Sequence, residues 1–162
     1  MREMLIRSSG QLEAFGRKFG RKVLKSSVGH SARIIALSGE LGAGKTTFLH
    51  GFAKGLGIKA RITSPTFILA RRHRIPKTRN KKQDTRYKYF WHLDVYRLRN
   101  EKDLDSIDFK EIISDPCNIV AVEWADRIKK AIPYSALWIQ LSHHKRGRRV
   151  TLPVKLYASR KR

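Results

Sequence analysis

Residues 39–46, Gly-Glu-Leu-Gly-Ala-Gly-Lys-Thr, constrain the fold of this chain more than any other stretch. The spacing, G-x-x-x-x-G-K-T, is that of a phosphate-binding loop between a strand and a helix. Glycines let successive backbone N–H groups point at phosphate oxygens, and the helix that follows adds the positive end of its dipole. A glycine-rich turn before an ordinary helix would leave the strand and helix context unexplained. The segment therefore predicts a nucleotide site.

The residues on either side of this loop fit that prediction. Residues 32–38 are short, apolar and rich in β-formers, which is typical of a buried strand. Residues 46–56 carry apolar side chains at helical spacing, and Gly57 is placed to end that helix. Lys45 is positioned to reach the β- and γ-phosphates, and the Thr46 hydroxyl to bind Mg²⁺.

Composition limits the class of protein. With 162 residues and 41% hydrophobic content, the chain is expected to be one domain over residues 1–162 with its own core. No apolar run approaches the ~18–20 residues of a membrane span, and residues 1–7 lack a signal-peptide core. The single cysteine, Cys117, cannot form an internal disulfide. A reducing cytoplasm is the simplest setting, with no membrane partner.

The charge balance favours polyanionic partners. Lys and Arg number 36 and Asp and Glu 13, which gives a net charge of +23. Nucleic acid is the partner that such a balance favours most, although a source organism with a generally basic proteome would also explain it. Residues 71–86 are polar and basic and predict an extended loop, and residues 159–162 form a basic tail.

The remaining elements follow from apolar spacing. A helix is expected after Ser8, with Gly16 and Gly20 implying either close packing or a bend. Strands are expected from Thr66 and over residues 87–96, where a period of two places Phe90, His92, Asp94 and Tyr96 on one face.

The C-terminal half continues the alternation of helices and strands. One or two short helices are expected over residues 100–113, a strand over 119–123, a short helix over 126–132, and strands over 136–142 and 148–157. Together these elements predict a three-layer α/β, P-loop NTPase-like domain with a central mixed sheet. Within it, residues 32–37 and 119–122 should lie side by side.

A phosphate loop also needs a carboxylate for Mg²⁺, commonly at the C-terminal end of a neighbouring buried strand. Glu123 follows four apolar residues and fits best, against the alternative of a surface glutamate. Asp94 is the second candidate, with a salt bridge to Arg97 as its structural alternative.

Four motifs in order carry a family resemblance: residues 39–47, Ser64-Pro65-Thr66-Phe67, residues 92–98 (His-Leu-Asp-Val-Tyr-Arg-Leu) and Glu123-Trp124. The chain resembles the bacterial ATPase family TsaE, also called YjeE, from about residue 12 to about residue 152. That family takes part in making threonylcarbamoyladenosine in tRNA.

The resemblance implies a role for each matching residue. Lys45 would hold the β/γ-phosphates, Thr46 and Glu123 would bind Mg²⁺, and Asp94 would orient or activate the attacking water. Thr66 would lie in a switch-like segment that senses the γ-phosphate. Contacts to ATP would come from Gly39, Glu40, Leu41, Gly42, Ala43, Gly44, Lys45, Thr46, Thr47 and Gly147. The implied partners are TsaD and TsaB, with tRNA contacted directly or through their complex.

Two other classes of protein fit parts of the sequence. A small P-loop kinase of a nucleoside or metabolite would use residues 71–86 as a lid, although this loop joins two expected strands and does not follow a helix. A nucleotide-switched RNA-binding module would explain the charge without requiring Glu123 and Asp94. Phosphate transfer to a small molecule identifies the first class, and turnover with and without RNA tests the second.

Overall fold

A seven-stranded mixed sheet forms the middle of the computed structural model, which describes residues 2–26, 29–62, 69–77, 86–98 and 101–153. Within those residues the strand order is β1-β7-β6-β2-β5-β4-β3. β2 is parallel to both β5 and β6, and β4 is parallel to β5, whereas β1, β3 and β7 join antiparallel. The strand bounds are β1 Arg2–Ile6, β2 Arg33–Ser38, β3 Ala70–Arg74, β4 Tyr89–Asp94, β5 Asn118–Glu123, β6 Leu137–His144 and β7 Gly147–Leu152.

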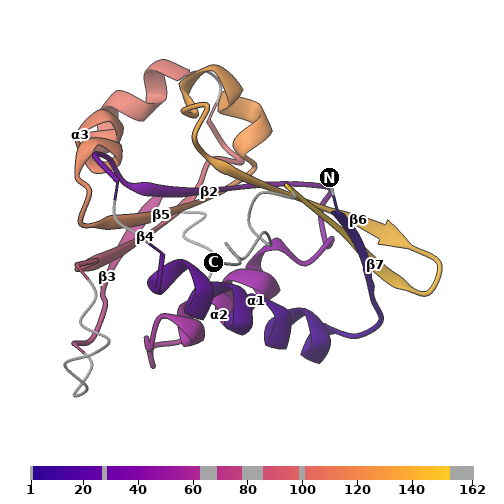
Figure 1. Ribbon diagram of the computed structural model, residues 1–162. Coiled ribbons are helices and arrows are strands. Elements are labelled where there is room, and N and C mark those ends of the chain that lie inside the picture. The colour runs from indigo at the N-terminus through magenta and orange to yellow at the C-terminus, as the bar shows by residue number, and fades with distance from the viewer. Residues whose placement is uncertain (1, 27–28, 63–68, 78–85, 99–100, 154–162) are drawn as a thin grey trace.

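Helices cover both faces of this sheet, as Figure 1 shows. The helices are α1 Ser9–Leu24, α2 Lys45–Gly55, α3 Phe109–Ser114 and the 3₁₀ segments η2 Glu101–Ile107 and η3 Ala125–Ala131. α1 and α2 pack on one face, and η2, α3 and η3 lie on the other. The expected three-layer α/β architecture with a mixed central sheet is confirmed.

Two separate cores follow from the alternation of side chains along the central strands. In β2, Ile35 and Leu37 face the α1–α2 layer, whereas Ile34 and Ala36 face the η2–α3–η3 layer. Every residue of β5 is buried, because this strand lies between β2 and β4 with helices on both sides. Residues 32–37 and 119–122 were expected side by side, and the register Ile34 to Val120 confirms it.

Small residues set the distance between α1 and α2. The Ser8 hydroxyl accepts a hydrogen bond from the Gln11 N–H and begins α1 as expected. A Cβ at Gly16 would collide with the Phe48 carbonyl oxygen, and one at Gly51 with the Glu13 carbonyl oxygen. A Cβ at Gly20 would likewise collide with the Phe52 carbonyl oxygen, so Gly16 and Gly20 mark close helix packing and not a bend.

The β3 edge of the sheet differs from the sequence prediction. The strand expected from Thr66 is Ala70–Arg74, and Thr66 itself lies outside the described residues. The expectation of a loop over residues 71–86 is therefore wrong for its first residues, which pair antiparallel with β4. Pairing with an aromatic neighbour overrides the polar composition, because Arg72 lies over the rings of Tyr89 and Trp91.

Two further boundaries also differ. β1 was not predicted, because a short edge strand that contains Arg2 and Glu3 has little apolar alternation. β7 ends at Leu152, and residues 154–157 of its expected range lie outside the described part of the chain, as do residues 78–85 and 159–162. No helix in the described residues combines the length and apolar composition needed to cross a membrane.

Candidate functional site

The phosphate-binding loop leaves the C-terminal end of β2, and α2 begins within it at Lys45. Gly44, the residue before α2, has φ of 102°, and Gly39 has φ of 136°, both in the region that favours glycine. A Cβ at Gly39 would collide with the Leu141 carbonyl oxygen, and one at Gly44 with the Leu12 side chain. No side chain of the described residues caps α2, so its first N–H groups remain directed at the space inside the loop.

Lys45 is a buried cation inside this loop. Its Nζ donates hydrogen bonds to the carbonyl oxygens of Gly39 at 2.6 Å and Glu40 at 2.8 Å. The same nitrogen lies 3.5 Å from the centroid of the Trp124 ring. Burial lowers the pKa of the Lys45 ammonium, and the nearby carboxylates, Glu123 first among them, oppose that shift.

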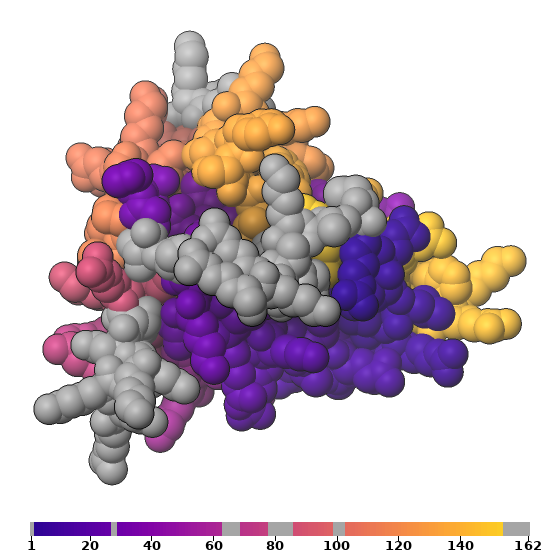
Figure 2. All heavy atoms as spheres, in the orientation of Figure 1, coloured from indigo at the N-terminus to yellow at the C-terminus, as the bar shows by residue number. Residues whose placement is uncertain are grey.

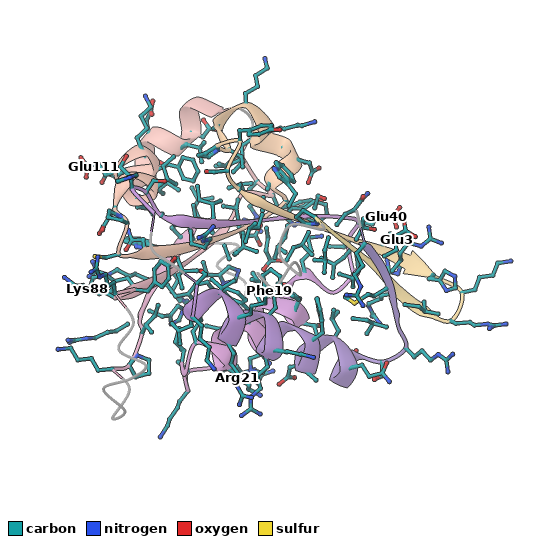
Figure 3. All side chains as sticks on the ribbon, viewed as in Figure 1. Glu3, Phe19, Arg21, Glu40, Lys88 and Glu111 are labelled. Atoms are coloured by element: carbon teal, nitrogen blue, oxygen red, sulfur yellow. The ribbon has the colours of Figure 1, made fainter. Side chains whose placement is uncertain are left out.

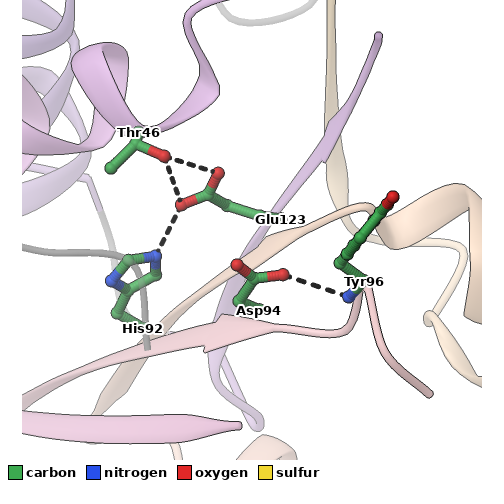
Figure 4. Close-up of polar contacts among 5 residues, drawn as sticks. All are labelled: Thr46, His92, Asp94, Tyr96 and Glu123. Carbon is green, nitrogen blue, oxygen red and sulfur yellow. Dashed lines mark hydrogen bonds and ion pairs between the residues drawn. The ribbon is translucent and has the colours of Figure 1, made fainter. Parts of the chain in front are cut away.

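Thr46 and Glu123 meet across the gap between α2 and β5. The Thr46 Oγ1 lies 3.1 Å from Oε1 and 3.0 Å from Oε2 of Glu123 (Figure 4). Two adjacent ligands of an octahedral Mg²⁺ with bonds of 2.0–2.1 Å are about 2.9 Å apart. The Thr46 hydroxyl donates a hydrogen bond to this carboxylate, and the two groups place hard oxygen atoms close enough together to bind one Mg²⁺.

Two buried residues of β4 adjoin Glu123 from the neighbouring strand. His92 Nε2 lies 2.8 Å from Oε1 of Glu123, and both side chains are shielded from solvent. Asp94 is paired in register with Glu123, so both carboxyl-bearing residues end parallel strands at one edge of the sheet. One oxygen of Asp94 accepts a hydrogen bond from the Tyr96 N–H at 3.0 Å. Phe90 and His92 share the α1–α2 face as predicted, whereas Tyr96 follows the end of β4.

The Trp124 ring packs against the Lys45 ammonium, which the loop carbonyls also contact. Trp124 directly follows Glu123, adopts φ of 61°, and places its ring 4.8 Å from that of Tyr96. The Arg127 guanidinium lies 5.6 Å from the Tyr96 ring. The turns after β4 and β5 thus place an aromatic pair beside the buried ammonium.

The β6–β7 hairpin reaches the phosphate-binding loop from a third direction. His143 Nε2 lies 3.0 Å from the Leu41 carbonyl oxygen. Gly147, predicted near the nucleotide, begins β7 opposite His144, and a Cβ there would collide with the Ile6 carbonyl oxygen. Arg148 packs against Gly44, and its Nε is buried without a hydrogen-bond partner in the described residues.

The structure thus collects Lys45, Thr46, Asp94 and Glu123 in one place, whereas Thr66 lies outside the described residues. The sequence interpretation gave no role to three residues of this site, His92, His143 and Arg148, although it placed His92 on one strand face with Asp94. Arg148 had a signal, because it follows Gly147 directly. His143 had none, because its contact with the loop depends on how the hairpin packs.

A phosphate-binding loop between β2 and α2, with a threonine on α2 bonded to a buried carboxylate at the end of β5, defines a P-loop NTPase-like protein. The family model for the threonylcarbamoyl adenosine biosynthesis protein TsaE matches residues 6–151. The chain belongs to the TsaE family, and the resemblance drawn from the four motifs is confirmed.

Curated relatives agree with this assignment, and one solved structure shares the fold. The tRNA threonylcarbamoyladenosine biosynthesis protein TsaE of Streptomyces coelicolor is 36% identical over 68% of this chain and 67% of the relative. Its counterpart in Treponema pallidum is 33% identical over 83% of this chain and 87% of the relative. The crystal structure of Bacillus subtilis YdiB matches the fold with a TM-score of 0.62 and 24% identity, over 93% of this chain and 83% of that one.

Proposed function

We propose that this protein is the ATPase of a tRNA threonylcarbamoyladenosine biosynthesis system, in which it hydrolyses ATP with Mg²⁺. It acts in the cytoplasm, in a complex with TsaD and TsaB, and residues 1–162 work as a single P-loop ATPase domain. Family membership and the names of the curated relatives support the pathway. The observation that best supports ATP hydrolysis is the contact between Thr46 Oγ1 and the Glu123 carboxylate beside Lys45.

Each residue of the site has a role in this proposal. The N–H groups of residues 39–47 bind the ATP phosphates, and Lys45 exchanges its two loop carbonyls for the β- and γ-phosphates. Thr46 and Glu123 hold Mg²⁺, which neutralises charge on the phosphate oxygens. Gly147 and Arg148 border the nucleotide from the β6–β7 hairpin.

Asp94 and Thr66 act on the hydrolytic step. The Asp94 carboxylate, buried beside Glu123 at the edge of the sheet, orients the attacking water and accepts its proton. Thr66 senses the γ-phosphate from its switch-like segment. Residues 71–74 of the lid that the kinase alternative requires pair with β4 in the sheet, and residues 78–85 of that lid lie outside the described residues.

Two variants test the activity. Lys45→Ala should abolish most ATP binding, since a buried cation within the loop is removed. Asp94→Asn should leave ATP binding intact and slow hydrolysis by about 10²–10⁴-fold, the range of a positioned general base. Binding is measured by calorimetry, and turnover by phosphate release with and without TsaD and TsaB. Unchanged turnover in Asp94→Asn would show that Asp94 has only a structural role.

A further inference from the structure

A basic groove lies at the β3–β4 edge of the sheet. We define it by the residues that line a cavity of about 490 Å³, which are Arg74, Ile75, Pro76, Lys77, Arg86, Tyr87, Lys88 and Tyr89. It is formed where β3 ends and β4 begins, and the Ile75 N–H donates a hydrogen bond to the Lys88 carbonyl oxygen there. Figure 3 shows Lys88 extending away from the fold on this side.

All charged side chains that line the basic groove are positive. The described residues 69–77 and 86–93 contain no aspartate or glutamate. Arg74, Lys77, Arg86 and Lys88 are exposed, and none of them forms an ion pair within the described part of the chain. Four cations around one cavity repel each other, so the groove favours a ligand that carries several negative charges.

Aromatic rings adjoin these cations. Tyr89 is half-buried and lines the groove. The Arg72 guanidinium lies 4.8 Å from the Tyr89 ring and 5.6 Å from the Trp91 ring, which holds a further cation against the sheet. A positive groove combined with aromatic rings and stacked arginine is the combination that binds RNA strands.

The basic groove is remote from the nucleotide site. Tyr89 begins β4 and Asp94 ends it, so about 17 Å of strand separates the two at ~3.3 Å per residue. In Figure 3, Glu40 of the phosphate-binding loop and Lys88 lie on opposite sides of the molecule. Figure 2 likewise shows residues near β3 at the left edge, away from the β6–β7 hairpin at the right.

We propose that the basic groove binds the sugar–phosphate backbone of RNA, with Arg74, Lys77 and Lys88 contacting phosphates and Tyr89 lying against a base. Phosphate contacts fix the position of a strand without reading its sequence, so sequence preference is weak. The choice of tRNA as the probe rests on the proposed function. The RNA contact itself does not, because it uses no residue of the ATP site.

The test compares two triple variants of equal charge. R74Q/K77Q/K88Q removes three cations from the basic groove, and R17Q/K18Q/K25Q removes one arginine and two lysines from the exposed surface of α1 and its C-cap. Affinity for a fluorescently labelled single-stranded RNA and for a tRNA transcript is measured over a salt series by anisotropy. Each lost contact to a single strand lowers the salt slope by about 0.7, so the groove variant should lose about 2 in slope. The α1 variant should keep the wild-type slope.

Three outcomes overturn the proposal. Equal loss of affinity in both variants would show that general charge, and not the basic groove, attracts RNA. Wild-type affinity in the groove variant would show that RNA binds elsewhere or not at all. Retained RNA binding with lost association with TsaD and TsaB would identify the groove as a contact for an acidic protein surface. Thermal unfolding and ATP binding, measured on each variant, separate these results from misfolding and from failure of the ATPase proposal.

Discussion

Glu123 illustrates how much a single residue of the site depends on its neighbours. Its position at the end of a buried strand was predictable from the sequence, because four apolar residues precede it and the loop motif demands a carboxylate. The contact with His92 was not predictable, since a period of two assigns a face of the strand and no partner on the next strand. His143 was missed for a similar reason, because its proximity to the loop results from hairpin packing.

His92 is expected to position Glu123. The ring donates from Nε2 to the carboxylate, whereas its Nδ1 is buried without a partner in the described residues. Partners of this kind typically change metal affinity by about 10–100-fold. We therefore expect His92→Leu to lower the affinity of the nucleotide-bound protein for Mg²⁺ by about that factor. His92→Gln, which can donate from a similar position, should restore part of it.

Calorimetric titration of Mg²⁺ into protein with a nucleotide analogue measures this effect, and the control is nucleotide affinity without Mg²⁺. A purely structural role predicts equal losses with and without the metal ion. That result, or equal behaviour of the leucine and glutamine variants, would contradict the positioning role.

Elements with regular apolar spacing were predicted well from the sequence. The strands at the two edges of the sheet were not. β2, α2 and β5 have clear apolar patterns, and β2 and β5 were expected to be neighbours because Thr46 and Glu123 must share one Mg²⁺. β3 is arginine-rich, and only its pairing with the aromatic face of β4 makes it a strand. Local sequence does not encode that pairing, because the two strands are separated along the chain.

The packing of α1 on α2 makes a prediction at the scale of elements. Gly16→Ala should lower the free energy of unfolding by about 1–3 kcal/mol, because the added Cβ collides with the backbone of α2. This overpacking outweighs the gain of about 1 kcal/mol in helix propensity. Gly10→Ala is the matched control, since the nearest atom to its Cβ would be the Ser8 Oγ at 3.9 Å. Urea unfolding measures both variants, and equal stability of the two would show that α2 moves away at little cost.

At the scale of the whole molecule, the net charge of +23 acts on stability as well as on binding. Like charges repel in the compact state, and salt screens them with a Debye length of about 10 Å at 0.1 M. The ion pairs of the described residues are mostly at the surface, where each contributes about 0–1 kcal/mol, so their loss in salt is small. Screening of repulsion should therefore exceed screening of attraction.

We expect the melting temperature to rise with added NaCl. A gain of about 1 kcal/mol corresponds to about 2–4 °C for a chain of this size. The variant R17Q/K18Q/K25Q, which carries three fewer positive charges, should start from a higher melting temperature in low salt and respond less. Calorimetric or fluorescence melts over a NaCl series measure both proteins, and sucrose serves as an uncharged control that stabilises by exclusion from the surface. A melting temperature that falls with NaCl would mean that ion pairs, and not repulsion, dominate the electrostatics of the folded chain.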